Sequence, residues 1–258
     1  WNGDGDDTYG EVSTTYGDDL CDMASEVALG RIPSSTVHET QDYIAKVILY
    51  EGQSAGVTWT NGFLAAAEVL FWIDEVTPST DGASFAEDLI NDFVVPCTDM
   101  SFTRYYENYT VYPGSLDETK DAVISAINSN QYGIMSQIGH GFFFDMSLGE
   151  GVFTVSDADA LENHEHPMLL FALNCASAAF DYSCLMERLV LHPTGGTIAS
   201  IGSSRAAFPY TSNNYQQEFF SLLLCEGVNT LGDTVELSRL PYLADVNHPS
   251  FNRWTYMN

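Results

Sequence analysis

Two residues with reactive side chains, His140 and Cys175, each follow a segment that predicts a strand. His140 stands in Gly139-His140-Gly141 after residues 132–138, and Cys175 follows residues 168–173 by two positions. In open α/β sheets, ligands bind beyond the carboxyl ends of the strands, so we expect both side chains at one rim. A thiol and an imidazole are the minimum for nucleophilic acyl transfer: the imidazole takes the thiol proton and the thiolate attacks a carbonyl.

Backbone groups beside these two residues complete the predicted chemistry. The N–H groups of Gly141 and Cys175 can form an oxyanion hole, and the glycines on either side of His140 let a substrate backbone approach closely. The alternative interpretation is a buried structural thiol and a histidine in an ordinary turn. The spacing of one Cys and one His does not decide between these two interpretations.

The elements that must position the pair alternate between strands and helices. Ser35-Thr36 followed by Glu39 is typical of a capping box at the start of a helix. We expect strands at 27–33, 69–73, 132–138, 168–173 and 197–201, and helices at 36–51, 83–94, 117–129 and 216–224. Segment 69–73 is expected to be a buried strand, and the continuous apolar run at 168–173 is typical of a parallel strand covered on both faces. This pattern predicts an α/β fold with a mostly parallel sheet.

Composition excludes several classes of function. The 258 residues include 8 Lys and Arg against 36 Asp and Glu, a net charge of −28, and 45% are apolar. This charge repels nucleic acid and anionic lipid surfaces, and we expect neither as a partner. The apolar run 63–73 is interrupted by Glu68 and is too short to span a membrane. The acidity favours solubility in saline surroundings or, alternatively, attraction of basic substrates.

The five cysteines leave two arrangements open. They are Cys21, Cys97, Cys175, Cys184 and Cys225. In a secreted protein, an odd number indicates two disulfides and one free reactive thiol. The alternative is five reduced thiols, because a free cysteine packs as a small apolar residue.

Several motifs together resemble the gingipain-type cysteine peptidases of family C25. They are Gly139-His140-Gly141, the strand 169–173 with the Asn174–Asp181 segment, Leu189–Ser204, and Ala28–Pro33 with the helix after it. The resemblance implies a caspase/gingipain-like three-layer sandwich, with a mostly parallel sheet flanked by helices. It implies that His140 and Cys175 are catalytic, and that the protein is secreted or on the cell surface of a prokaryote. We expect one catalytic domain over 1–258, cut at both ends, with an acidic loop segment 1–27 and an α/β core 28–258.

The resemblance also implies further site residues. An acidic residue at the end of strand 69–73 is expected to orient the imidazole, with Glu75 preferred and Asp74 as the alternative. An acidic pocket residue is expected downstream, where Asp81, Glu87 and Asp88 lie, and we select Asp81. The remaining predicted substrate-binding residues are Ser203, Ser204, Arg205, Phe208 and Tyr210. Arg205 in the pocket would disfavour basic substrate residues and accept acidic ones, whereas on the surface it would form a salt bridge.

The N-terminal loop is a candidate calcium site. Asn2, Asp4 and Asp6 alternate, with Glu11 further on, as at the opening of an EF-hand loop. Asp7 stands where that loop requires glycine, and Ser13 stands where it has glutamate. The alternatives are a structural calcium ion, which family members often need, and a solvated acidic turn. We expect no cofactor for catalysis.

The leading hypothesis is a secreted cysteine endopeptidase that forms a thioester acyl-enzyme and acts on proteins or peptides. The expected partners are those substrates and a propeptide or neighbouring domains of a longer precursor. The alternative is a catalytically silent, gingipain-like peptide-binding or scaffold domain of a larger surface protein. A third hypothesis keeps the Cys-His chemistry in a transpeptidase or self-processing enzyme.

Overall fold

The computed structural model describes residues 5–7, 12–13, 17–18, 25–53, 57–74 and 76–244. The chain forms two compact units, one from residues 1–30 and 210–258 and the other from residues 31–209. The larger unit, 31–209, contains His140 and Cys175 and is described first.

A six-stranded sheet forms the centre of the larger unit, in the order β13-β12-β8-β3-β6-β7. Its strands are β3 (Gly62–Ala67), β6 (Ser101–Tyr106), β7 (Leu116–Asp117), β8 (Ile134–Ile138), β12 (Met168–Leu173) and β13 (Thr197–Ile201). Every neighbouring pair in this sheet is parallel. Strands β3 and β12 are buried along their whole length, as expected for parallel strands covered on both faces.

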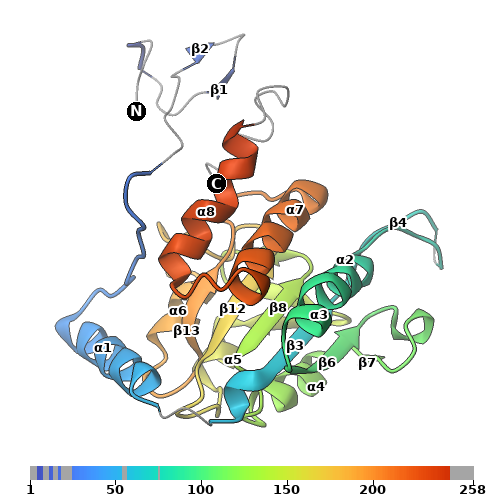
Figure 1. Ribbon diagram of the computed structural model, residues 1–258, viewed down its shortest axis with the longest axis horizontal. Helices are drawn as coiled ribbons and strands as arrows, with labels where there is room; N and C mark the ends of the chain where they lie inside the picture. Colours follow the sequence, from blue (N-terminus) through green and yellow to red (C-terminus); the bar gives the residue numbers. More distant parts are fainter. Residues whose placement is uncertain are drawn as a thin grey trace. The chain divides into compact units, whose positions relative to one another are not determined.

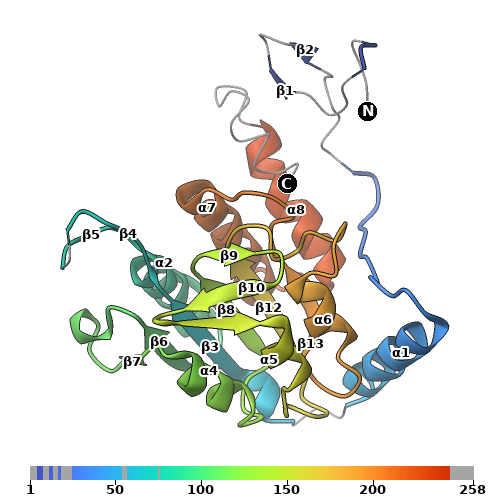
Figure 2. The ribbon, with the colours of Figure 1, turned by 180° about the vertical axis from the view of Figure 1, so that it is seen from behind.

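Helices cover both faces of this sheet, which confirms the predicted sandwich. Strand side chains alternate between faces, so Leu64 and Leu170 join one core cluster with Val123 of α4 (Lys120–Ile127) and Leu185 of α6 (Leu185–Leu191). Helix α2 (Gly82–Leu89) lies on the opposite face and contacts β3 and β8. Figure 1 shows α2 in front of β3, and Figure 2, from behind, shows α4 and α6 on the other side.

Two smaller sheets accompany the central one. Strands β4 (Val69–Trp72) and β5 (Pro78–Asp81) form an antiparallel hairpin, which Figure 2 shows projecting from the rest of the unit. Strands β9 (Gly141–Phe142), β10 (Asp145–Leu148) and β11 (Gly151–Thr154) form an antiparallel sheet in the order β11-β10-β9. Strand β9 begins directly after His140, and β8 ends two residues before it. The β11-β10-β9 sheet and the central sheet therefore meet at the predicted site.

The predicted capping box is confirmed. Helix α1 (Val37–Glu51) begins after Thr36, whose hydroxyl accepts a hydrogen bond from the backbone N–H of Glu39, while the Glu39 carboxylate accepts one from the N–H of Thr36. The other helical segments of this unit are η1 (Trp59–Asn61), η2 (Ile90–Val94), α3 (Val95–Cys97), η3 (Tyr109–Val111) and α5 (Val155–Asp159).

The second unit has its own elements. They are β1 (Val12–Ser13), β2 (Gly17–Asp18), α7 (Pro209–Phe220), η4 (Ser221–Cys225) and α8 (Leu231–Ala244), of which α7 begins at the last residue of the larger unit. Within this unit, the Ser25 hydroxyl donates a hydrogen bond to the Glu236 carboxylate of α8. The predicted helix 216–224 thus corresponds to α7 and η4.

One predicted strand is absent, and another is present but less buried than predicted. Residues 27–33 have no regular secondary structure and are largely exposed. Segment 69–73 does contain a strand, β4, but only its first two residues are buried and it belongs to the hairpin rather than to the central sheet. The buried strand of this region is β3, which ends one residue before Glu68.

The cysteines differ from both predicted arrangements. Cys97 and Cys225 each take part in a disulfide bond, whereas Cys175 and Cys184 carry free thiols. With two of the five thiols free, the chain cannot contain two internal disulfides, and with two oxidised it does not contain five reduced thiols. Across the described part of the chain, no helix is long and apolar enough to cross a membrane.

Candidate active site

Three neighbouring parallel strands end at the same level, and each is followed by a residue of the candidate site. Ile138 of β8 pairs with Ala67 of β3 on one side and with Leu173 of β12 on the other. Glu68 comes one residue after β3, while His140 and Cys175 each come two residues after their strands. The register therefore brings a carboxylate, an imidazole and a thiol to one rim, as predicted for the last two.

Backbone contacts hold these strand ends together. The N–H of Glu68 donates to the Ile138 carbonyl at 2.9 Å, and the N–H of Gly139 donates to the Leu173 carbonyl at 3.1 Å. A Cβ atom on Gly141 would lie 3.0 Å from the Cys175 carbonyl oxygen. The loop that carries His140 therefore packs directly on the loop that carries Cys175, and glycine is needed for this close approach.

Glu68 is the carboxylate that contacts His140. It is 6% exposed, and its Oε2 accepts a hydrogen bond from the backbone N–H of His140 at 2.7 Å. Burial raises the pKa of Glu68 to about 7, although the hydrogen bond and the positive charge of a protonated His140 both lower it. A Cβ atom on Gly139 would lie 2.5 Å from Oε2 of Glu68, so glycine also makes room for this carboxylate.

A backbone carbonyl sets the protonation of the His140 ring. Its Nε2 lies 2.9 Å from the Leu70 carbonyl oxygen, and a carbonyl can only accept. Nε2 therefore carries the proton in the neutral ring, and Nδ1 is left as the basic nitrogen. The Phe71 ring packs edge-on against the imidazole, with the ring centroids 5.8 Å apart.

The Cys175 sulfur receives a hydrogen bond from the backbone. The N–H of Ala207 donates to Sγ at 3.3 Å, which holds the sulfur in a fixed position. The side chain is partly exposed. The next residue, Ala176, has φ of 55°, a strained value for a residue other than glycine. Its N–H donates to the Arg205 carbonyl, which holds the strained turn in place.

The buried amide side chains of Asn174 and Gln137 hold the Cys175 loop in place through hydrogen bonds. Asn174 donates from Nδ2 to Oε1 of Gln137 on β8 at 2.8 Å and accepts from the Ser177 hydroxyl. Gln137 in turn donates to the Ser147 carbonyl of β10 at 3.1 Å. This chain of hydrogen bonds links the residues on either side of Cys175 to the strand that leads to His140.

Of the two predicted acidic partners of the imidazole, the structure describes only the alternative, Asp74. Asp74 caps the hairpin turn, where its Oδ1 accepts from the N–H groups of Val76 and Thr77. Glu75 lies outside the described residues, and its role stays a prediction. Sequence analysis missed Glu68, although the sequence carried a signal: Glu68 is the only charged residue in the apolar run 63–73.

The structure places part of the predicted substrate pocket next to Cys175. The Ser203 carbonyl accepts from the N–H of Ala178, so Ser203, Ser204 and Arg205 belong to a segment packed on the Cys175 loop. The Arg205 guanidinium forms a two-fold hydrogen-bonded ion pair with Asp181, at 3.0 and 3.1 Å. Phe208 follows in the same segment.

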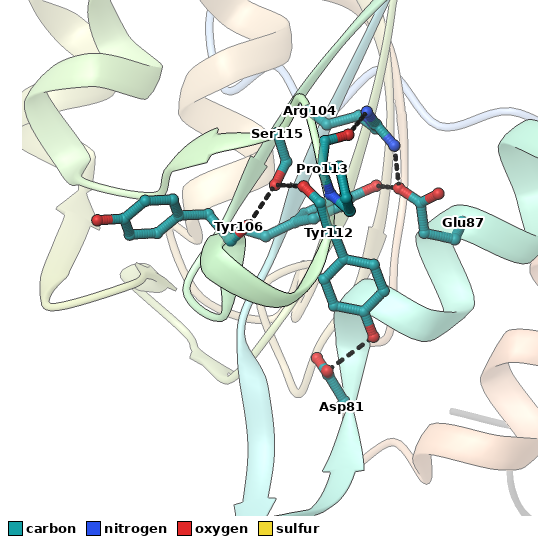
Figure 3. A network of polar contacts seen from close by, with 8 residues as sticks. Asp81, Glu87, Arg104, Tyr106, Tyr112, Pro113 and Ser115 are labelled. Carbon is teal, nitrogen blue, oxygen red and sulfur yellow. Dashed lines mark hydrogen bonds and ion pairs between the residues drawn. The ribbon is translucent and has the colours of Figure 1, made fainter. Parts of the chain in front are cut away.

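Tyr210 belongs to the unit formed by 1–30 and 210–258, and its place in the pocket stays a prediction. Another predicted pocket residue, Asp81, lies elsewhere. Asp81 caps α2, where its Oδ1 accepts from the N–H of Ala83, and its Oδ2 accepts from the Tyr112 hydroxyl at 2.8 Å (Figure 3). Gly141 and Cys175 remain the predicted oxyanion donors.

The predicted calcium site cannot be described as a group. Asn2, Asp4 and Glu11 lie outside the described residues, and Asp6 is exposed. Within the part of the chain that the structure describes, no group of three or more His, Cys, Asp or Glu side chains is arranged to hold a metal ion. The calcium site therefore stays a prediction.

The fold and this site define a class: a caspase-like α/β protein with a cysteine and a histidine at the carboxyl edge of a parallel sheet. The chain belongs to peptidase family C25, whose family model matches residues 3–257. The predicted family and fold are thereby confirmed. No curated protein sequence matches the chain significantly.

Solved gingipain structures share the fold. The Arg-specific cysteine proteinase gingipain R (RgpB) is 19% identical over 92% of this chain and 54% of its own, with a TM-score of 0.73. The complex of Porphyromonas gingivalis RgpB pro- and mature domains is 19% identical over 91% of this chain and 55% of its own, with a TM-score of 0.71. The chain thus spans about half of the length of each of these structures.

Proposed function

We propose that this chain is a cysteine endopeptidase in which Cys175 is the nucleophile and His140 the general base. The observation that carries the proposal is the register of β3, β8 and β12, which brings Glu68, His140 and Cys175 to one rim with their loops in contact. Membership of peptidase family C25 supports the same reaction class.

The proposed reaction begins with proton transfer to the imidazole. The Leu70 carbonyl holds the proton on Nε2 of His140, so Nδ1 is the nitrogen that accepts the Cys175 proton. The thiolate then attacks the substrate carbonyl carbon, and a C–S bond forms while the carbonyl π electrons move to oxygen. The predicted donors for this oxyanion are the N–H groups of Gly141 and Cys175.

Collapse of the tetrahedral intermediate breaks the C–N bond. The leaving amine takes the proton from Nδ1 of His140, and the acyl group stays on Cys175 as a thioester. Water then attacks the thioester with His140 as base, which releases the acid and restores the thiol. Glu68 acts here as a positioning residue, because it holds the His140 backbone and, when ionised, stabilises the imidazolium.

We also propose that the protein works outside the cytoplasm, on the cell surface or in the surroundings. The disulfide-bonded Cys97 and Cys225 support this location, because disulfides persist in oxidising compartments. A propeptide that covers the site is a proposed partner. One matched structure is a complex of pro- and mature domains, which supports such a partner.

The test is hydrolysis of a mixed peptide library by the wild-type chain, by Cys175→Ala and by Cys184→Ala. Cys184 is buried and free, so its variant is a control for the loss of a thiol. The proposal predicts cleavage by the wild-type chain and by Cys184→Ala and none by Cys175→Ala. No cleavage by correctly folded wild-type chain would instead favour the silent scaffold.

A further inference from the structure

Two of the three acidic residues predicted near a specificity pocket are occupied within the chain. Asp81 uses one carboxylate oxygen to cap α2 and the other to accept from Tyr112 and from Nδ2 of Asn108. Glu87 accepts from the Arg104 guanidinium at 2.6 Å and from the Tyr106 hydroxyl at 3.0 Å (Figure 3). Both carboxylates are therefore already engaged by groups of the chain itself.

The hairpin formed by β4 and β5 (residues 69–81) instead presents apolar side chains. Exposed fractions along it are 50% for Phe71, 42% for Trp72, 71% for Ile73 and 82% for Val76. Three consecutive exposed apolar residues are unfavourable in water and are typical of a binding surface.

The hairpin is preformed, although it exposes apolar side chains on both sides of its turn. Asp74 accepts hydrogen bonds from two backbone N–H groups across the turn, and the N–H of Ile73 donates to the Thr77 carbonyl at 2.8 Å. The Ser79 hydroxyl also donates to the Phe71 carbonyl. A preformed surface binds with less loss of conformational entropy, so these contacts favour a binding role.

The same hairpin contacts one of the two candidate catalytic residues, His140. The Leu70 carbonyl is hydrogen-bonded to the His140 ring, and the Phe71 ring packs against it. Phe142, two residues after His140, is 55% exposed. A peptide held at Cys175 and His140 therefore lies next to an apolar surface that continues from the reacting groups.

We propose that the β4–β5 hairpin binds an extended substrate peptide through bulky apolar side chains close to the scissile bond. The substrate specificity of this chain then differs from the Arg specificity stated for gingipain R. The proposal rests on the proposed function for the identity of the occupant, and its test uses binding rather than turnover. Trp72 and Ile73 are the specificity-determining residues, whereas Phe71 also supports His140.

The test uses the full chain with Cys175→Ala, so that peptides bind without being cleaved. Two soluble peptides of equal length differ at two adjacent positions, Leu-Phe in one and Lys-Arg in the other. Binding is measured by calorimetry at about 0.5 M NaCl, where screening limits the general attraction of the basic peptide to a chain of net charge −28. The hairpin variant is Trp72→Ser/Ile73→Ser. The matched control is Val37→Ser/Ile48→Ser, which alters two exposed apolar residues of α1.

The Leu-Phe peptide is expected to bind roughly tenfold more tightly than the Lys-Arg peptide. The hairpin variant should lose roughly tenfold in affinity for the Leu-Phe peptide, while the α1 control should not. The proposal would be overturned if the Lys-Arg peptide bound more tightly than the Leu-Phe peptide, or if neither peptide bound. It would also be overturned if the hairpin substitutions left the affinity for the Leu-Phe peptide unchanged. A dimer in sedimentation that the hairpin variant abolishes would overturn it as well, because a second copy would then be the occupant.

The two proposals fail separately. If the Leu-Phe peptide binds through the hairpin but the wild-type chain cleaves nothing, the endopeptidase proposal fails and the hairpin proposal stands. If the wild-type chain cleaves peptides after Arg or Lys and the hairpin variant does so equally, the hairpin proposal fails and the endopeptidase proposal stands. Circular dichroism melting curves of all variants verify that each is folded.

Discussion

At His140, one carboxylate supplies both position and charge. Glu68 accepts the backbone N–H of His140, and its pKa of about 7 means that it loses its proton near neutral pH. Only the ionised form stabilises the imidazolium that develops during catalysis. Glu68 therefore makes its charge contribution above about pH 7 and loses it below.

Glu68→Gln tests this role through pH dependence. The amide keeps the acceptor oxygen but carries no charge at any pH. The ratio of wild-type to variant kcat/KM is expected to rise with pH through about 7 and to reach roughly tenfold at pH 8.5. A ratio that stays constant from pH 5.5 to 8.5 would mean that the charge of Glu68 does not act on the imidazole.

Glu118 predicts a pH dependence of stability. It is 1% exposed, and burial together with the nearby charges of Glu68 and Glu107 raises its pKa well above the usual 4.5. The folded chain then holds a proton that the unfolded chain releases, so this group lowers stability as pH rises above about 4.5. Glu118→Gln should raise the melting temperature relative to wild type more at pH 8 than at pH 5. An equal difference at both pH values would contradict this account.

At the scale of elements, α1 is fastened to the end of α6 by one buried cation. Nζ of Lys46 donates to the carbonyl oxygens of Val190, His192 and Gly195 at 2.6, 2.9 and 3.1 Å. Burial lowers the pKa of Lys46 to about 8. These carbonyls lie at the C-terminal end of α6 and just beyond it, where backbone acceptors lack helical partners.

Lys46→Met should destabilise the chain by about 3 kcal/mol, because it leaves three carbonyls without their donor. Lys120→Met is the matched control, since Lys120 is the only other lysine and its 3.3 Å ion pair with Asp157 is partly exposed. We expect the control to cost less than about 1 kcal/mol. Urea unfolding curves measure both free energies, and equal losses would contradict the role assigned to Lys46.

The strands that lead to the candidate catalytic pair were predictable, whereas the strand that leads to Glu68 was not. Strand β12 is a continuous apolar run that ends two residues before Cys175, and β8, which contains Ser136 and Gln137, ends two residues before His140. Strand β3 contains three consecutive alanines, which have high helix propensity, and it becomes a strand by pairing with β6 and β8 on its two sides. Such pairing is a tertiary effect that local sequence does not carry.

The β4–β5 hairpin accounts for the other incorrect prediction, the burial of residues 69–73. Residues 69–73 are apolar in sequence, and an apolar run normally predicts burial. Here the run continues past the end of the sheet into β4, so its last residues are exposed. Its apolar character is better explained by binding than by packing, which is why local pattern alone placed it wrongly.

At the scale of the whole molecule, charge repulsion opposes folding. With 36 acidic and 8 basic residues, the chain carries a net charge of −28, so its charges on the whole repel one another. Added salt shortens the Debye length from about 30 Å at 0.01 M to about 3 Å at 1 M. We expect NaCl and KCl to raise the melting temperature alike by several degrees over this range. A fall with either salt would mean that ion pairs outweigh repulsion.

The central claim is that His140 activates Cys175, and site-resolved alkylation tests it most directly. Iodoacetamide is added at pH 6.5, and mass spectrometry follows labelling at Cys175 and at Cys184, whose pKa burial raises. The account predicts fast labelling of Cys175 and slow labelling of Cys184 in the wild-type chain. In His140→Ala, the labelling rate of Cys175 should fall roughly tenfold or more, while the rate of Cys184 stays the same. Equal rates at Cys175 with and without His140 would contradict the catalytic pair.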